Sequence, residues 1–345
     1  MSTTATNSTI DEQPAEALLA RVRGLIDPVL RAAVDSMPIQ LGRMGAYHFG
    51  WVDATGAAAA GVPGKGLRPA LTLVAAAACG AEPAAAVQVA AGVELLHNFA
   101  LIHDDVMDRD AFRHARPTVW RVWGVTNALL LGDALQALAI GVIAEGMPEP
   151  MIGESVARVV NTMLTVCAGQ YDDCAFEQRP SVEVGEYLSM AAAKTGALLG
   201  CACALGALCA GADQLLVARM NTFGRELGVA FQLVDDVIGI HGDPRVTGKP
   251  AGADLIRRKQ SFPVVCTLGS QSMAGQRLSR LYRRPGPMTP AEVAAAVGSI
   301  TEAGGLEQTL RCARDRVQAA LEVLPPEVIT DDLRTLADLA AQRDR

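Results

Sequence analysis

The chain has 345 residues, and its 37 acidic and 30 basic side chains give a formal charge of −7. This mildly acidic balance argues against a general nucleic-acid-binding protein, because contacts to phosphates need basic patches. Hydrophobic residues make up 50% of the chain but aromatic residues only 4%. An apolar fraction carried by Ala, Leu and Val favours packed helices over a β-sandwich.

Residues 1–13 are rich in Ser and Thr and contain neither an apolar core nor an Arg. We therefore expect a flexible N-terminal tail and not a secretory signal or transit peptide. The longest apolar run, 196–212, has 17 residues and several glycines, which is short for a membrane span of about 18–20 residues. We expect a buried core helix there and no integral membrane segment. The eight cysteines contain no CxxC pair, which is typical of reduced thiols in a cytoplasmic protein.

Apolar periodicity predicts helices over almost the whole chain. The expected helices are 14–35, 67–79, 85–108, 127–145, 152–174, 182–210, 213–240 and a final set from 290 to about 339. No segment alternates long enough to predict a strand, and no Gly/Ser linker divides the chain. We therefore expect one all-helical domain over 14–345. The arginine-rich stretch 276–290 is expected to be a solvated loop.

A cluster of carboxylates ends the expected helix 85–108. Helical spacing places Asp104 and Asp108 on one face, with His97 two turns earlier on nearly the same face. Because this helix is apolar on nearly every side, we expect it to be buried, where carboxylates are costly unless they are paired or bound to a metal. Carboxylates at i and i+4 suit Mg²⁺, which bridges such groups to substrate phosphates.

Asp235 and Asp236 end the expected helix 213–240 in the same way. Two such clusters, each at the end of a long apolar helix, predict facing acidic walls with metal ions between them.

Several cations accompany these acids. Lys65 and Arg68 flank the point where a Gly-containing loop enters a helix, which is a favourable site for an anion. Lys194 interrupts an otherwise apolar helix, while Lys249 and Lys259 follow the second acidic cluster. Acidic walls, metals and cations around an apolar cavity describe a site for a diphosphate with a hydrocarbon tail.

In this order and combination the motifs resemble those of trans-isoprenyl diphosphate synthases, in the polyprenyl synthetase family. The matching segments are Gly64-Lys65 to Arg68-Pro69, Asp104 to Asp108, Arg113 to Thr118, Gly169-Gln170, Phe231 to Asp236, Gly248-Lys249-Pro250 and Lys259 to Pro263. The resemblance covers about residues 47–325. It implies an isoprenoid-synthase-type bundle of antiparallel helices around a deep central pocket, and a homodimer.

The resemblance also implies the roles of individual residues. Three Mg²⁺ ions would be bound directly by Asp104, Asp108 and Asp235, with Asp105 and Asp236 supporting them. The allylic diphosphate would be held by Arg113, Lys194, Thr195, Gln232, Lys249 and Lys259. Isopentenyl diphosphate would be held by Lys65, Arg68 and His97. The expected catalytic residues are Asp104, Asp108, Lys194 and Asp235, which stabilise the departing diphosphate.

Three positions depart from the family pattern. His114 stands where a second arginine normally binds isopentenyl diphosphate, Gly66 stands where many members have Arg, and Gly239 ends the second acidic motif in place of Asp. The first two departures keep a terpene cyclase on the same fold as an alternative. The retained Lys65, Arg68 and His97 favour chain elongation. A non-catalytic partner subunit is disfavoured, because it would need neither acidic cluster.

Product length is expected to depend on the helix before Asp104. Phe99 lies about 140° from the Asp104 face by helical geometry, so periodicity alone does not place it in the pocket. In the family, however, an aromatic residue here followed by a small one, Ala100, resembles geranylgeranyl diphosphate synthases. We therefore predict a C20 product, with Phe99 as the floor and C15 as the next choice.

Overall fold

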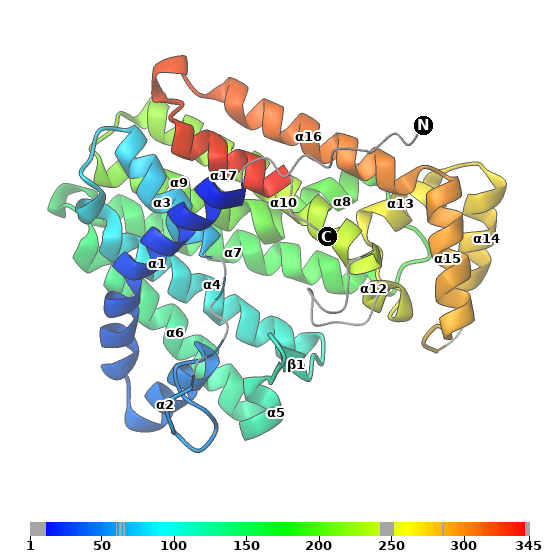
Figure 1. Cartoon of the computed structure of the whole chain (residues 1–345), viewed down its shortest axis with the longest axis horizontal. Coiled ribbons are helices and arrows are strands. Elements are labelled where there is room, and N and C mark those ends of the chain that lie inside the picture. Colours follow the sequence, from blue (N-terminus) through cyan, green and yellow to red (C-terminus); the bar gives the residue numbers. More distant parts are fainter. Residues whose placement is uncertain are drawn as a thin grey trace, which may run out of the picture.

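The computed structural model describes residues 12–59, 61, 64, 66–241, 252–284 and 286–341 (Figure 1). This part of the chain is almost entirely helical, which confirms the all-α prediction. Most of the expected tail, residues 1–11, lies outside the described residues, and Glu12 already begins the first helix. The expectation of one domain stays a prediction.

Helices make up nearly all of the described elements. In chain order the helices are α1 (Glu12–Asp35), α2 (Ile39–His48), α3 (Leu67–Ala78), η1 (Pro83–Ala86), α4 (Val87–Met107), α5 (Val119–Trp123), α6 (Val125–Gly146), η2 (Glu149–Met151), α7 (Ile152–Phe176), α8 (Val184–Ala191), η3 (Ala192–Gly196), α9 (Ala197–Cys209), α10 (Gln214–His241), α12 (Ala253–Ile256), α13 (Phe262–Gly269), α14 (Met273–Tyr282), α15 (Pro290–Glu302), α16 (Gly305–Val323), η4 (Pro326–Val328) and α17 (Asp331–Ala341). Two short strands, β1 (Phe112–Arg113) and β2 (Arg116–Pro117), lie between α4 and α5.

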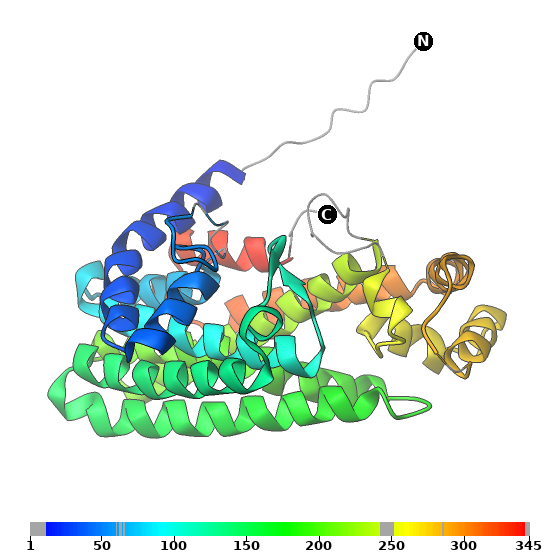
Figure 2. The same ribbon diagram turned by 90° about the horizontal axis from the view of Figure 1, so that it is seen from below.

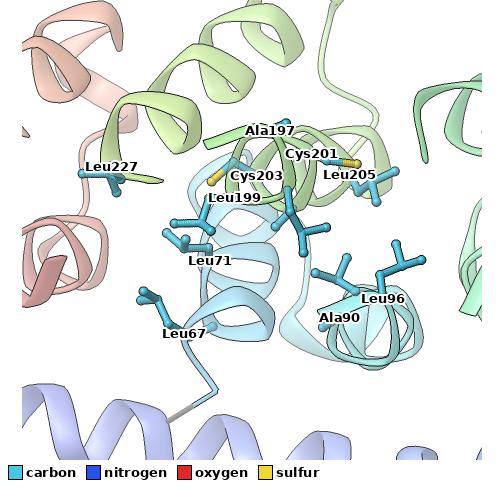
Figure 3. Close-up of a cluster of buried hydrophobic side chains, with 14 of the residues drawn as sticks. Leu67, Leu71, Ala90, Leu96, Ala197, Leu199, Cys201, Cys203, Leu205 and Leu227 are labelled. Carbon is cyan, nitrogen blue, oxygen red and sulfur yellow. The ribbon is translucent and has the colours of Figure 1, made fainter. Parts of the chain in front are cut away.

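Helix α9 forms the centre of the core. Its side chains are buried from Ala197 to Leu208, between α3, α4 and α10 (Figure 3). The helix is apolar all round because it has neighbours all round. This confirms the buried core helix expected within 196–212.

Three helical stretches are long and apolar enough to cross a membrane by length and composition: Ala84–Met107, Val125–Gly146 and Val184–Cys209. Packing inside the protein buries 61% of the apolar window in the first and 78% in the third, but only 39% in the second. The second stretch is α6, which lies beside α7 along one face (Figure 2). Much of the apolar surface of α6 therefore remains exposed.

A smaller group of helices, α12 to α15, packs around a second apolar cluster that includes Leu255, Leu278 and Ile300. The expected loop over 276–290 is wrong for its first half, because α14 extends to Tyr282. The helix buries Leu278 and turns its arginines outward, where Arg277 pairs with Glu302. The arginines had masked a one-sided apolar pattern.

The strands β1 and β2 form an antiparallel hairpin that the sequence did not predict, because two residues per strand are too few to show alternation. Its turn residues His114 and Ala115 have φ of 49° and 59°, as a two-residue turn of the primed type requires. The Arg116 guanidinium donates to the carbonyl oxygens of Tyr47, at 3.0 Å, and Val52, at 2.9 Å. These bonds hold the hairpin against the end of α2 and the segment that follows it.

The left-handed conformation of Ala115 leads to a stability prediction. Side chains are disfavoured there while glycine is not, so Ala115→Gly should raise the free energy of unfolding by about 0.5–1 kcal/mol. Urea denaturation measures the change. The matched control is Ala20→Gly on the exposed face of α1, which should lower stability by about 0.5–1 kcal/mol. A loss of stability in Ala115→Gly would contradict the prediction.

Candidate functional site

A cavity of about 690 Å³ opens between α1, α3, α4, the hairpin, η3 and α10. Most of the predicted site residues line it: Arg68, His97, Asp104, Asp105, Arg113, His114, Lys194, Thr195, Gln232, Asp235 and Lys259. Asp108, Asp236 and Phe99 do not line it. Lys65 and Lys249 lie outside the described residues.

The two acidic helix ends face this cavity from α4 and α10. Burial raises the pKa of Asp104, an effect that Lys194 opposes and Asp108 reinforces. Asp108 caps the end of α4 one turn later, and Asp235 lies on the wall formed by α10. Among the described residues, no three His, Cys, Asp or Glu side chains form a metal site on their own. The acids nevertheless fit Mg²⁺, which is usually bound by one or two carboxylates together with waters and substrate phosphates.

Asp105 faces a protein cation. The Arg113 side chain donates from Nε at 3.0 Å and from Nη2 at 2.8 Å to Asp105 Oδ1. The Asp105 side chain is only 3% exposed, so this fork supplies the partner that a buried carboxylate needs. The arrangement fits the supporting position predicted for Asp105 beside Asp104.

Asp236 points away from the cavity into a hydrogen-bonded network. It accepts bonds from the Tyr187 hydroxyl, from the Phe262 N–H at 2.7 Å and from Gln232 Nε2 at 3.1 Å. Burial raises its pKa to about 7. Thr195 Oγ1 donates to Gln232 Oε1 at 2.7 Å, which extends the network to η3. Asp236 therefore fixes the orientation of Gln232 and, through it, of Thr195.

Lys194 and Lys259 meet at one carboxylate, Asp173, that the sequence analysis missed. Their Nζ atoms lie 2.6 Å and 3.2 Å from Asp173 Oδ2. Burial raises the pKa of Asp173, but the two lysine charges outweigh it and lower the pKa below its usual value. Asp173 follows Gln170 by three residues on α7, and this helical spacing beside a family motif could have indicated it.

A π-helical turn, η3, presents Lys194 and Thr195 to the cavity. It interrupts the single helix expected over 182–210, and such turns are frequent at functional sites. Gly169 makes the turn possible, since a Cβ there would lie 2.3 Å from the backbone nitrogen of Lys194. Close packing against η3 therefore explains the glycine of the Gly169-Gln170 motif.

The other end of the cavity carries Arg68 and His97. Arg68 Nη1 lies 3.0 Å from His97 Nε2. Because arginine can only donate, that nitrogen accepts and the ring is neutral. Burial and the Arg68 charge hold the pKa of His97 well below its usual value, and burial also lowers the pKa of His114. Neither histidine therefore adds a positive charge at neutral pH.

Three further polar residues line this end and were also missed. His48 Nε2 lies 2.9 Å from Asn98 Oδ1, and Asn98 Nδ2 donates to Glu94 Oε1 at 3.2 Å. Burial raises the pKa of Glu94 to about 7, although the charge of Arg68 opposes the rise. No short motif marks these residues, because α2 and α4 bring them together only in the fold.

Phe99 is buried outside the cavity lining, with its ring edge-on to His103 at 5.1 Å between centroids. Its neighbours Ala100 and Leu101 line the cavity instead. The 140° offset that helical geometry gives Phe99 explains this placement.

The glycine at position 239 has a structural reason. A Cβ there would lie 2.1 Å from Asp254 Oδ2 on α12. The Asp254 carboxylate thus occupies the space beside α10 that a side chain at this position would need.

Known proteins resemble this chain over most of its length. The Polyprenyl synthetase family profile matches residues 50–300. A geranylgeranyl diphosphate synthase from Mycobacterium tuberculosis is 50% identical over 329 residues, 95% of this chain and 94% of the relative. A (2E,6E)-farnesyl diphosphate synthase from Mycobacterium bovis is 42% identical over 290 residues, 84% of this chain and 80% of the relative. The crystal structure of a polyprenyl synthetase from Streptomyces coelicolor matches with a TM-score of 0.88 and 43% identity, covering 94% of this chain and 99% of that one.

The close approach at Gly169 leads to a second prediction. In Gly169→Ala the new methyl group would meet the backbone of η3, which cannot move as a side-chain end can. We expect a loss of about 1–3 kcal/mol in the free energy of unfolding. Gly24→Ala is the control, because a Cβ at Gly24 meets nothing within 4 Å, and alanine should stabilise α1 by about 0.5–1 kcal/mol. Equal effects in the two variants, measured by urea denaturation, would contradict the packing reason given for Gly169.

Proposed function

Because the chain belongs to the polyprenyl synthetase family, we propose that it is a Mg²⁺-dependent trans-prenyltransferase that joins an allylic diphosphate to isopentenyl diphosphate. The observation that carries the proposal is one cavity with two acidic helix ends at one side and Arg68 at the other. The acidic side suits a metal-bound diphosphate that leaves, and the arginine side suits a second diphosphate that stays.

At the acidic side, Asp104, Asp108 and Asp235 would hold Mg²⁺, in the number of three that the family resemblance implies. The ions would supply positive charge to the departing diphosphate. The supporting bonds of Asp105 and Asp236 to protein donors keep these two carboxylates in fixed orientations.

Lys194 and Lys259 are the protein's cations for the leaving diphosphate. Burial alone would lower the pKa of Lys259, but the charges of Asp173 and of other nearby carboxylates outweigh it and raise the pKa, so the ammonium group stays charged at neutral pH. Three donors on each ammonium let it bind a phosphate oxygen while Asp173 keeps its place. Such preorganised charge stabilises the diphosphate as it departs.

The carbon chemistry then needs no dedicated base. The C1–O bond of the allylic diphosphate breaks, and the isopentenyl double bond attacks the allylic cation to form the new C–C bond. The attack moves the positive charge to C3 of the isopentenyl unit. A proton then leaves the adjacent C2, which restores a double bond, and the released diphosphate takes the proton. The apolar wall that includes Leu101, Val166 and Leu198 excludes water from the cation.

Chain elongation is supported over cyclisation. Both mycobacterial relatives are named as elongating synthases, and nothing in the comparisons favours the cyclase. For product length we propose C20, the length in the name of the 50% identical relative, with C15 as the next choice.

We also propose that the enzyme is a soluble, cytoplasmic homodimer. Several large apolar side chains are exposed on α6 and α7, among them Leu130 at 53% and Leu164 at 66%. Since α6 is apolar but little buried, an association with the same face of a second copy would cover it.

The function is tested by product analysis. The purified enzyme with Mg²⁺, an allylic diphosphate and labelled isopentenyl diphosphate should form a longer prenyl diphosphate, and EDTA should abolish turnover. Asp104→Asn should lower kcat by about 100-fold or more through loss of a metal-facing charge, whereas the exposed Asp172→Asn should not. Product formed equally well from the allylic substrate alone would favour the cyclase, and full activity in EDTA would overturn the metal assignment.

Product length is tested at the cavity wall. Ala100→Phe should shorten the product by at least one C5 unit, because the ring would fill space beside α4 that the hydrocarbon tail needs. Chromatography of the dephosphorylated products measures the length. Phe99→Ala is the comparison, since Phe99 lies outside the cavity lining. If Phe99→Ala lengthens the product while Ala100→Phe leaves it unchanged, the floor lies on the Phe99 side of α4.

A further inference from the structure

Helix α1 forms one wall of the cavity at the end that carries Arg68. Arg23, Asp27, Leu30 and Arg31 all face the cavity, as the helical spacing of these positions requires. No motif of the sequence analysis includes α1. Helix α1 is therefore part of the site, although no function has so far been assigned to its charged residues.

The arginines that line the cavity differ in their existing contacts. Arg31 lies over an indole ring at 4.4 Å, Arg113 forks onto a carboxylate, and Arg116 donates to two backbone carbonyls. Within the part of the chain that the structure describes, Arg23 takes part in none of the hydrogen bonds, ion pairs or ring contacts. A half-buried guanidinium of this kind is available to an anion.

Arg23 lies beside the start of α3. Gly66, the residue before α3, has φ of 69°, and a Cβ there would lie 3.6 Å from Arg23 Cγ. Among the described side chains none caps this end of α3, so its first N–H groups have no side-chain partner there. The side chain of Arg23 thus occupies the space beside position 66, and Arg68 lines the same cavity.

The charge balance at this end calls for a further cation. His97 is neutral because it accepts a bond from Arg68, and burial lowers the pKa of His114. Position 66 has no side chain. The cavity arginines Arg31, Arg113 and Arg116 already hold other contacts, so a second diphosphate gains from a cation that holds none among the described residues.

We propose that Arg23 of α1 binds the diphosphate of the acceptor substrate, isopentenyl diphosphate, and supplies a positive charge that positions 66 and 114 lack in this chain. The inference rests on the proposed function. In this chain the further cation of the acceptor site thus comes from helix α1 and not from the hairpin that carries His114.

The test is steady-state kinetics of the full-length enzyme with the two substrates varied separately. Arg23→Ala should raise KM for isopentenyl diphosphate by about 10-fold or more, the loss expected for one charge-assisted hydrogen bond. KM for the allylic diphosphate should stay within about twofold. Arg23→Lys should recover part of the loss, because the charge returns without the planar fork.

Direct binding of isopentenyl diphosphate, measured by calorimetry without allylic substrate, separates binding from turnover. Arg23→Ala should weaken this binding to the same extent. Arg21→Ala is the matched control, since Arg21 lies two residues earlier on α1, has a 65% exposed side chain and pairs with Asp332. It should leave both measurements unchanged.

The outcomes distinguish the two proposals. If the wild-type enzyme elongates, and Arg23→Ala has the same KM for isopentenyl diphosphate and binds it equally well, only the role of Arg23 is overturned. An equal rise in both substrates' KM values in Arg23→Ala also overturns it, because it would indicate a general structural defect. If the wild-type enzyme neither binds nor consumes isopentenyl diphosphate, the proposed function and this inference are both overturned.

Discussion

Charges inside an apolar helix bundle must be paired, and this constraint organises the cavity. Asp173 is 8% exposed and meets two lysines, while Asp105 meets Arg113. Leaving one partner of such a pair alone in the interior would cost about 3–5 kcal/mol. The fold therefore depends on the same charged groups to which the proposed function assigns the binding of a diphosphate.

These pairs leave the cavity ready for a charged ligand. Carboxylates and cations both line it, so the proposed diphosphate with its metal ions would add charges of both signs without leaving a buried group unpaired. Hydrogen bonds and close packing behind the cavity fix the positions of these charged groups. Asp236 links α8, α10 and α13 through three hydrogen bonds, and Gly169 lets α7 approach η3 closely enough to direct Lys194 into the cavity.

Local patterns predicted much of this in advance. The long apolar helices that carry Asp104 and Asp235 were expected close to their observed ends, because burial on one face imposes a period that is visible in the residues themselves. The gathering of most motif residues around one cavity was also expected, since each motif contains residue types that bind a metal ion or a phosphate. The short hairpin, α14 and the π-turn were missed. The hairpin and the π-turn are too short, and α14 is too rich in arginine, for a periodic apolar pattern to be visible in the sequence.

The sequence by itself determined the all-helical class, the family and the chemical types in the site, because these depend on composition, period and motif order. Only the tertiary structure decided which carboxylate faces which cation. Glu94 and Arg23 reach the cavity from α4 and α1, while Asp173 on α7 pairs with the two lysines that line it. Phe99 turns away from the cavity. The physical reason is that the direction of a side chain depends on how its helix packs against helices distant in the chain, and the residues beside it in the sequence do not carry that information.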